Sequence, residues 1–358
     1  MKNIKILMLS LVGVFTLGLS SCVKDLETTP IDPNVQLPQD VLKDEAAFEA
    51  LLAKCYQGLA CSSSDGANGG PDISGVDGGF GQYLRAYFNL QCLTTDEAVC
   101  CWNDTGLPDM HNMNWQASNQ FIVAMYYRIF YQVSLCNEFI RQINENVAGV
   151  EFTNKGGLVA EARALRALSY YHAIDMFGNV PFATEKDAVG AVGPRQISRA
   201  DLFTWVEKEC KELIEGNDLA AEGQNVYGRC DKGFVKMILA KLYLNAEVYT
   251  GTAQWDKAAE YAKKVMNSSY KLNTTGTNGW SAYQMLFMGD NGESTASQEA
   301  VFPILQDGLT TASYGTFFFL MASTFTGDMY ANPFDPTALN GSADGSWGGN
   351  RARPDLIK

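Results

Sequence analysis

The segment Gly157–Phe182, GLVAEARALRALSYYHAIDMFGNVPF, constrains the fold more than any other part of this 358-residue chain. Its apolar residues recur at spacings of three and four, which predicts one buried stripe along a helix: Leu158, Ala162, Leu165, Leu168 and Tyr171. Arg163 and Arg166 lie off this stripe, where they can reach carboxylates or solvent. Phe177-Gly178-Asn179 should end the helix, because Gly and Asn accept a left-handed terminal conformation, and Pro181 prevents it from resuming. Taken alone, the segment predicts a packed helix with structural roles.

Similar apolar periodicity predicts further helices, at Asp40–Gly58, Asn119–Asn146, Ser198–Glu215, Gly233–Tyr249 and Gln254–Met266. The helix at 119–146 should pair with the helix in 157–182 as an antiparallel hairpin. The last two helices carry small alanines, Tyr249 late in the first and Trp255 opening the second, as in a tetratricopeptide unit. We therefore predict a mostly α fold, with a tetratricopeptide-like helical-hairpin scaffold mainly in 119–270. Long irregular loops and a few short strands should fill the rest, including Leu107–Trp115 and the loop-rich part 271–358.

The N-terminal residues predict a lipoprotein signal peptide at 1–21. A basic start precedes an apolar run that is too short to span a membrane comfortably, and Leu19-Ser20-Ser21-Cys22 matches a bacterial lipobox. Cys22 would then be the acylated first residue of the mature protein, with palmitate or a similar chain as its anchor. The alternative is an ordinary secretory peptide with an incidental cysteine. Residues 22–39 contain three prolines and predict an extended tether, so the folded domain would occupy 40–358.

Composition and spacing exclude several functions. A net charge of −13 makes nucleic acid an unfavourable partner, and the presence of only 2 His restricts histidine metal sites and Ser–His–Asp triads. Asp96 and Glu97 are adjacent, so they are not a glycosidase pair, which needs two carboxylates at a set separation across the bond. His172 is interpreted as a packed histidine. The glycine-rich loop 61–81 lacks the GxxxxGK[ST] spacing of a phosphate loop. We expect no catalytic residue, metal or cofactor.

Eight cysteines remain beside Cys22. Cys136 and Cys210 lie on apolar helix faces and should act as small hydrophobic residues. Disulfides are possible in a surface-exposed protein, for example between Cys55 and Cys61 or between Cys92 and Cys100, and spacing alone does not choose between them.

The best candidate for a binding site combines Arg85, Trp102, Asn103 and Asp104. Trp102 stands in a turn among polar residues rather than on a helical stripe. The C–H face of a sugar ring can pack on an indole, while amide, carboxylate and guanidinium groups bind its hydroxyls. The alternative is that Trp102 fills the edge of the core.

The segment 157–182 and the stretch GQYLRAYFNLQCLTTDEAVCCWND together resemble the SusD/RagB family of outer-membrane nutrient-binding lipoproteins. The resemblance is strongest to the starch-binding type that names the family. It implies a sugar-stacking tryptophan at Trp102, an arginine at Arg85 and further aromatic residues from later loops. Tyr314 and Trp347 are the candidates for those later positions.

This resemblance implies a protein lipid-anchored in the outer membrane and exposed at the cell surface, with a role in polysaccharide utilisation. It would bind an oligosaccharide or polysaccharide, with a starch-like α-glucan favoured, and deliver it to a TonB-dependent transporter without covalent chemistry. The alternative is a tetratricopeptide-type scaffold that binds protein and has no sugar affinity. Family members are typically longer, and Asp355-Leu356-Ile357 after Pro354 looks like the first turn of a further helix. We therefore expect the C-terminal end of the domain to be missing.

Overall fold

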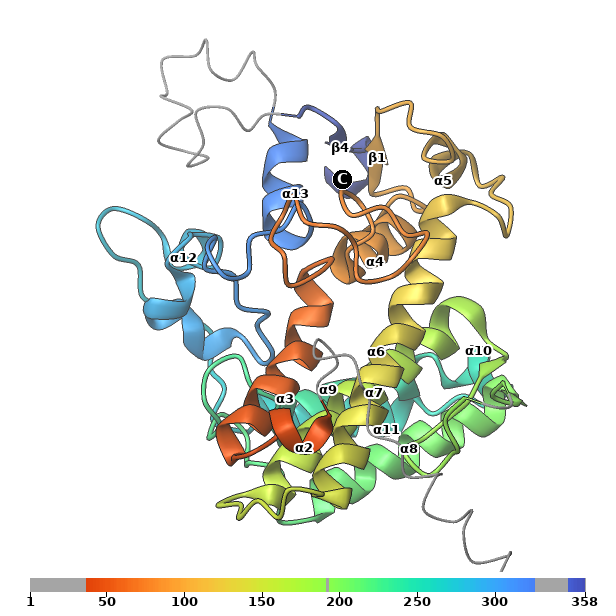
Figure 1. Ribbon diagram of the computed structural model, residues 1–358. Coiled ribbons are helices and arrows are strands. Elements are labelled where there is room, and N and C mark those ends of the chain that lie inside the picture. Colours follow the sequence, from red (N-terminus) through yellow and green to blue (C-terminus); the bar gives the residue numbers. More distant parts are fainter. Residues whose placement is uncertain (1–36, 191–192, 326–346, 358) are drawn as a thin grey trace, which may run out of the picture. The chain divides into compact units, whose positions relative to one another are not determined.

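The computed structural model describes residues 37–190, 193–325 and 347–357 (Figure 1). The predicted signal peptide, Cys22 and most of the tether lie outside these residues. The chain divides into two units, 1–43 and 44–358. In the first unit the described residues include the short helix α2 (Pro38–Val41). All that follows concerns the second unit.

The second unit is mostly α-helical, as predicted. Its longer helices are α3 (Glu45–Ala60), α4 (Tyr83–Cys92), α6 (Gln120–Glu145), α7 (Lys155–Phe177), α8 (Arg199–Glu215), α9 (Lys232–Leu244), α11 (Trp255–Met266) and α13 (Thr316–Thr324). The shorter ones are α5 (Pro108–Asn112), α10 (Ala246–Thr250), α12 (Ala282–Met285), η2 (Asn291–Glu293), η3 (Thr295–Glu299) and α15 (Pro354–Ile357). Two antiparallel strand pairs complete the described part, β1 (Ala98–Cys100) with β4 (Asn350–Ala352) and β2 (Val180–Pro181) with β3 (Gln196–Ile197).

Helices α6 and α7 pack against each other at the centre of the scaffold (Figure 1). Their ends follow the cap residues in the sequence. The Asn119 side chain accepts a hydrogen bond from the first turn of α6, and Asn154 does the same for α7. Asn146 ends α6 with a φ of 43°, and Gly178 follows α7 with a φ of 74°. Both predicted helices are therefore confirmed, as is the stop at Gly178.

Helix α7 is buried around most of its circumference, whereas the sequence predicted a single stripe. It packs against α3, α6, α8 and α9, and the alanines between the larger apolar residues are buried as well: Ala160, Ala164, Ala167 and Ala173. A helix with neighbours on several sides needs small residues on several faces, which explains its alanine content.

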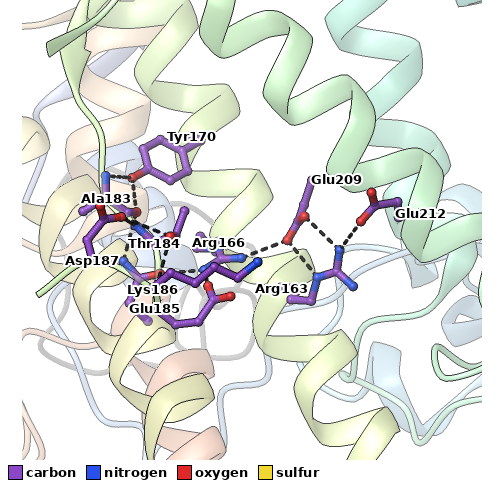
Figure 2. A network of polar contacts seen from close by, with 11 residues as sticks. Arg163, Arg166, Tyr170, Ala183, Thr184, Glu185, Lys186, Asp187, Glu209 and Glu212 are labelled. Atoms are coloured by element: carbon purple, nitrogen blue, oxygen red, sulfur yellow. Dashed lines mark hydrogen bonds and ion pairs between the residues drawn. The ribbon is translucent and has the colours of Figure 1, made fainter. Parts of the chain in front are cut away.

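Both arginines of α7 reach carboxylates (Figure 2). Arg163 makes a bidentate contact with Glu209 of α8, at 2.9 and 2.8 Å, and a further 2.8 Å contact with Glu212. Arg166, only 2% exposed, bonds Glu209 at 2.9 Å and Glu185 at 2.5 Å. Burial alone would lower the pKa of Arg166, but these two carboxylates hold it above its ordinary value. The network thus joins α7 to α8 and to the segment after β2.

Two predicted helices are interrupted, and one predicted loop contains a helix. The helix expected over 40–58 starts anew at α3, because the Asp44 carboxylate accepts a hydrogen bond from Ala47 N and caps it. The helix expected over 233–249 is divided at Asn245 into α9 and α10. Pro108 opens α5 within the predicted loop 107–115, at the helix position that tolerates proline best.

Helices α9 and α11 pack together as the tetratricopeptide pattern predicted. Tyr249 is buried, but Trp255 is 60% exposed and does not fill the interface as we expected. Ala258 and Val265 are the buried residues of α11, and the Tyr261 ring lies 5.6 Å from that of Tyr243 on α9. On the α11 side, the contact between these helices is therefore made by residues such as Ala258, Tyr261 and Val265, and not by Trp255.

Candidate functional site

Three segments far apart in the sequence meet around Trp102. Strand β1 pairs with β4, and Cys101 N donates to Gly349 O at 2.9 Å just beyond that pair. This pairing places Trp102 beside Trp347, and the indole Nε1 of Trp102 donates to Trp347 O at 3.1 Å. Helix α13 and the residues before it form the third segment, and α13 contacts both α4 and β4 (Figure 1).

Four side chains from these segments form a continuous group that we call the aromatic cluster: Trp102, Tyr314, Phe318 and Trp347. The Trp347 ring centroid lies 6.3 Å from Trp102, 6.0 Å from Tyr314 and 5.3 Å from Phe318. Phe318 is 40% exposed, and the other three rings are half-buried. The cluster therefore presents aromatic surface to solvent while its members support one another.

Arg85 and Phe319 lie beneath the cluster. Phe319 is buried, and its ring packs edge-to-face with that of Trp102, with 6.4 Å between the ring centroids. The Arg85 guanidinium carbon is 4.2 Å from the centroid of the Phe319 ring, and Nη1 donates to Gly79 O at 2.7 Å and to Tyr314 O at 3.1 Å. Burial lowers the pKa of Arg85 to about 10. Arg85 thus remains charged at neutral pH and holds the backbone of Tyr314 in place.

A small cavity of about 20 Å³ lies under Trp102, with Arg85, Asn89 and Asp104 among its lining residues. Arg85 Nε and Asn89 Oδ1 are buried and have no hydrogen-bond partner among the described residues. The volume suits a single water molecule, and a donor and an acceptor are the partners that such a water requires. The floor of the site therefore holds one hydrogen-bond donor and one acceptor that are not engaged by the protein in the described ranges.

The predicted site residues are brought together only in part. Asn103 and Asp104 are exposed beside Trp102, and Arg85, Tyr314 and Trp347 join them through the contacts above. Two other aromatic residues of the later loops, Trp280 and Tyr283, are not part of the cluster, and the Tyr283 ring packs on Phe287 instead. Sequence reasoning missed two residues. One is Phe318, hidden within an apolar run, and the other is Asn68, whose Oδ1 accepts a 2.7 Å hydrogen bond from the Tyr314 hydroxyl.

Several residues for which the sequence predicted no catalytic or ligand-binding role can be located in the structure. Asp96 is exposed, and its Oδ1 lies 3.8 Å from Arg353 Nη1. His172 is packed as predicted: its Nδ1 is 2.8 Å from the Tyr83 hydroxyl, and burial lowers its pKa to about 3, so the ring is neutral. Cys136 and Cys210 are fully buried, in agreement with their role as small hydrophobic residues.

All eight cysteines in the described ranges are free. Neither of the two disulfides considered from spacing, Cys55–Cys61 and Cys92–Cys100, is therefore formed.

A larger hollow, of about 620 Å³, lies between α3 and the segments 226–229 and 303–311. None of the predicted site residues lines it. Glu49, Lys54 and Arg229 are its charged lining residues, and the two cations pair with carboxylates that do not line it, Arg229 with Glu161 at 2.8 Å and Lys54 with Asp72 at 3.6 Å. We therefore assign the candidate site to the aromatic cluster.

No group of three or more His, Cys, Asp or Glu side chains in residues 37–190, 193–325 and 347–357 could hold a metal ion. Within the same ranges, every helix is too short or too polar to cross a lipid bilayer.

Comparison with known proteins supports one family. No family model matches the chain. The chain is 34% identical over 317 residues to the starch-binding protein SusD of Bacteroides thetaiotaomicron, an alignment that covers 88% of this chain and 53% of that protein. The chain therefore spans about half the length of this relative.

Solved structures share the fold. Surface glycan-binding protein A from Bacteroides fluxus has a TM-score of 0.57 at 17% identity, over 87% of this chain and 60% of that one. A SusD homologue from Bacteroides thetaiotaomicron also has a TM-score of 0.57 at 17% identity, over 76% of this chain and 50% of that one. At such identities the similarity is one of fold.

Proposed function

The chain belongs to the SusD family, and on this premise we propose that it binds oligosaccharides or polysaccharides by stacking sugar rings on the aromatic cluster. A starch-like α-glucan is the favoured ligand, because the relative that shares 34% of aligned residues is named for starch binding. The protein would bind its ligand and release it chemically unchanged.

The observation that carries this proposal is the meeting of four aromatic rings with one side open to solvent. A pyranose ring has a face of C–H groups that packs on aromatic faces, and its hydroxyl groups need polar neighbours at the rim. Asn103 and Asp104 are exposed next to Trp102 and supply an amide and a carboxylate there. Apolar surface with a few well-placed polar groups is the usual composition of a ligand site.

Location and delivery are further parts of the proposal. The lipobox supports acylation of Cys22 and anchoring in the outer membrane, with the domain at the cell surface. The family resemblance supports transfer of the glycan to a TonB-dependent outer-membrane transporter. Replacement of Cys22 by alanine should abolish incorporation of labelled fatty acid, and continued labelling of the variant would reject the anchor.

The alternative, a tetratricopeptide-type scaffold that binds protein without sugar affinity, is favoured by a different observation. Apolar side chains are exposed on and around α9–α11, namely Leu244, Val248, Trp255 and Met266. Exposed apolar patches of this kind can mark protein interfaces. Copurification of a β-barrel transporter would fit both functions, so sugar affinity decides between them.

The test is calorimetric titration of the Trp102→Ala variant with maltooligosaccharides, together with a thermal melt. Truncation of a central stacking residue should raise Kd about thirtyfold, which corresponds to roughly 2 kcal/mol. Trp102 is only half-buried, so the loss of folding stability should stay below the roughly 3–5 kcal/mol expected for a core tryptophan.

Trp255→Ala is the matched control, since it removes an exposed tryptophan from α11 and should change neither affinity nor melting temperature. Unchanged affinity in a folded Trp102→Ala protein would reject the proposed site. A collapsed melt would instead assign Trp102 to the core.

A further inference from the structure

We propose that Asn68, on the glycine-rich loop 61–81, is a specificity-determining residue of the glycan site that donates a hydrogen bond from its side-chain amide to a ligand hydroxyl. The inference rests on the proposed function of the aromatic cluster. It adds a hydrogen-bonding group at the edge of the aromatic cluster, whose aromatic residues the family resemblance already implied.

Asn68 contacts the aromatic cluster directly. Its Oδ1 accepts the 2.7 Å hydrogen bond from the Tyr314 hydroxyl, and the Tyr314 ring is 6.0 Å from the Trp347 ring. An amide group has an accepting and a donating end, and a phenol can engage either one. With Oδ1 engaged by Tyr314, the Nδ2 donors of Asn68 have no partner among the described residues. Asn68 is exposed, so this free end is available to a ligand.

The position of this amide matches the chemistry of a stacked sugar. When the face of a pyranose packs on aromatic rings, its equatorial hydroxyls project beyond the edge of the ring system. A polar group at the rim of the cluster can therefore reach them, and it can discriminate between sugars whose hydroxyls point differently. Asn103 and Asp104 occupy the rim near Trp102, and Asn68 occupies it near Tyr314.

The loop around Asn68 is fixed in spite of its glycines. Arg128 of α6 is fully buried and binds the loop at both ends and in the middle. Its Nε donates to Gly81 O, Nη1 contacts Asp72 at 2.7 Å and Nη2 donates to Ser62 O at 3.1 Å. A loop held at three points loses less conformational freedom when a ligand binds, so a contact from Asn68 is less costly in entropy.

A second part of the loop touches the floor of the site. The Asp77 carboxylate accepts hydrogen bonds from Gly79 N and Phe80 N at 2.7 and 3.0 Å, which fixes a tight turn. Gly79 O in this turn accepts the 2.7 Å hydrogen bond from Arg85. The loop therefore meets the site twice, at Arg85 beneath the cluster and at Tyr314 at its edge.

The test compares Asn68→Ala, Asn68→Asp and the in-loop control Asp65→Ala by calorimetric titration with maltoheptaose. Asn68→Asp keeps an oxygen that accepts from Tyr314 but removes both amide donors. If Asn68 donates to the ligand, both Asn68 variants should bind about three- to tenfold more weakly, the usual range for one neutral hydrogen bond. Asp65→Ala should bind as the wild type does.

The outcomes separate this inference from the proposed function. Wild-type affinity in Asn68→Asp would overturn the donor role, because positioning of Tyr314 alone would then be sufficient. Weakening by Trp102→Ala with no effect of either Asn68 variant would reject this inference and leave the proposed function standing. A wild-type protein that binds neither maltoheptaose nor any glycan of an array would reject both.

Discussion

A buried arginine and a half-buried one show how differently the scaffold and the site are constructed. Arg166 in the scaffold is held by Glu209 and Glu185, which raise its pKa in spite of burial. Arg85 in the site contacts two carbonyl oxygens and the face of Phe319, and burial lowers its pKa to about 10. The scaffold charge is neutralised by direct ion pairs, whereas Arg85 contacts carbonyl dipoles and a ring, with Asp104 and Asp77 acting on its charge without a direct ion pair among the described residues. The two arginines therefore differ in whether a carboxylate meets the guanidinium directly.

The aromatic groups of the two regions differ in the same way. Tyr170, Phe182 and Trp205 pack in a triangle with centroid separations of 5.1–5.3 Å, and the Tyr170 hydroxyl both donates to and accepts from the backbone of Ala183. The aromatic cluster is more open, with separations of 5.3–6.3 Å, and exposes Phe318. In the scaffold triangle the three rings pack closely on one another. In the cluster the rings are farther apart, and aromatic surface remains exposed that a ligand could cover.

Removal of one scaffold carboxylate should give the largest effect. Glu209→Ala leaves the buried Arg166 with one carboxylate, and we expect a loss of about 3 kcal/mol or more in the free energy of unfolding. Glu212→Ala is the matched control: it lies three residues along α8, binds the same Arg163 and is half-exposed, so the loss should be below about 1 kcal/mol. Urea unfolding of both variants measures the difference. Equal losses would contradict the role given to burial in this network.

A single added methyl group should disturb the site without removing any of its rings. A Cβ added at Gly349 would lie 2.3 Å from Cε2 of Trp102, so Gly349→Ala must displace the indole or strand β4. We expect a loss of about 1–3 kcal/mol in the free energy of unfolding, together with weaker binding of maltoheptaose. Gly289→Ala adds a methyl where nothing lies within 4 Å and should leave affinity unchanged. Wild-type affinity for maltoheptaose in Gly349→Ala would mean that a displaced Trp102 does not affect binding, which would contradict its role in stacking.

The smallest of these effects concerns the most exposed ring of the cluster. Phe318→Ala should raise the Kd for maltoheptaose about three- to tenfold, as expected for a peripheral stacking contact. The melting temperature should change little, since Phe318 is 40% exposed. Leu320→Ala removes a similarly exposed side chain from α13 that has no ring, and titration should find its affinity normal. If Leu320→Ala weakens binding as much, general disturbance of α13 would explain both results.

The scaffold was more predictable from sequence than the site. The ends of α6 and α7 depend on local residues such as Asn119, Asn154 and Gly178, whose preferences act within one turn of the chain. Where the expected helices were wrong, as at Asp44 and Asn245, a polar residue that can cap a helix had been read as part of its interior. Burial around α7 depends on how many neighbours it has, which periodicity does not reveal.

For the candidate site, the sequence pointed to individual residues but did not predict how they are arranged in space. Arg85 and Trp102 were candidates from their chemistry and position, Tyr314 and Trp347 through family resemblance, and only the tertiary fold brings them into one group. Phe318 was missed because an apolar run gives no sign of which of its members stays exposed. Asn68 was missed because its role comes from contact with Tyr314, a residue distant in the sequence.

The pairing of β1 with β4 has a consequence for the order of folding. Trp102 and Trp347 are separated by 245 positions along the chain, so their contact closes a very long loop and carries a correspondingly large entropic cost. Hairpins such as α6–α7 form from neighbouring segments and should appear earlier during synthesis. We therefore expect the amides of β1 and β4 to exchange hydrogen more readily than those of α7, and a bound glycan to slow that exchange by favouring the closed form.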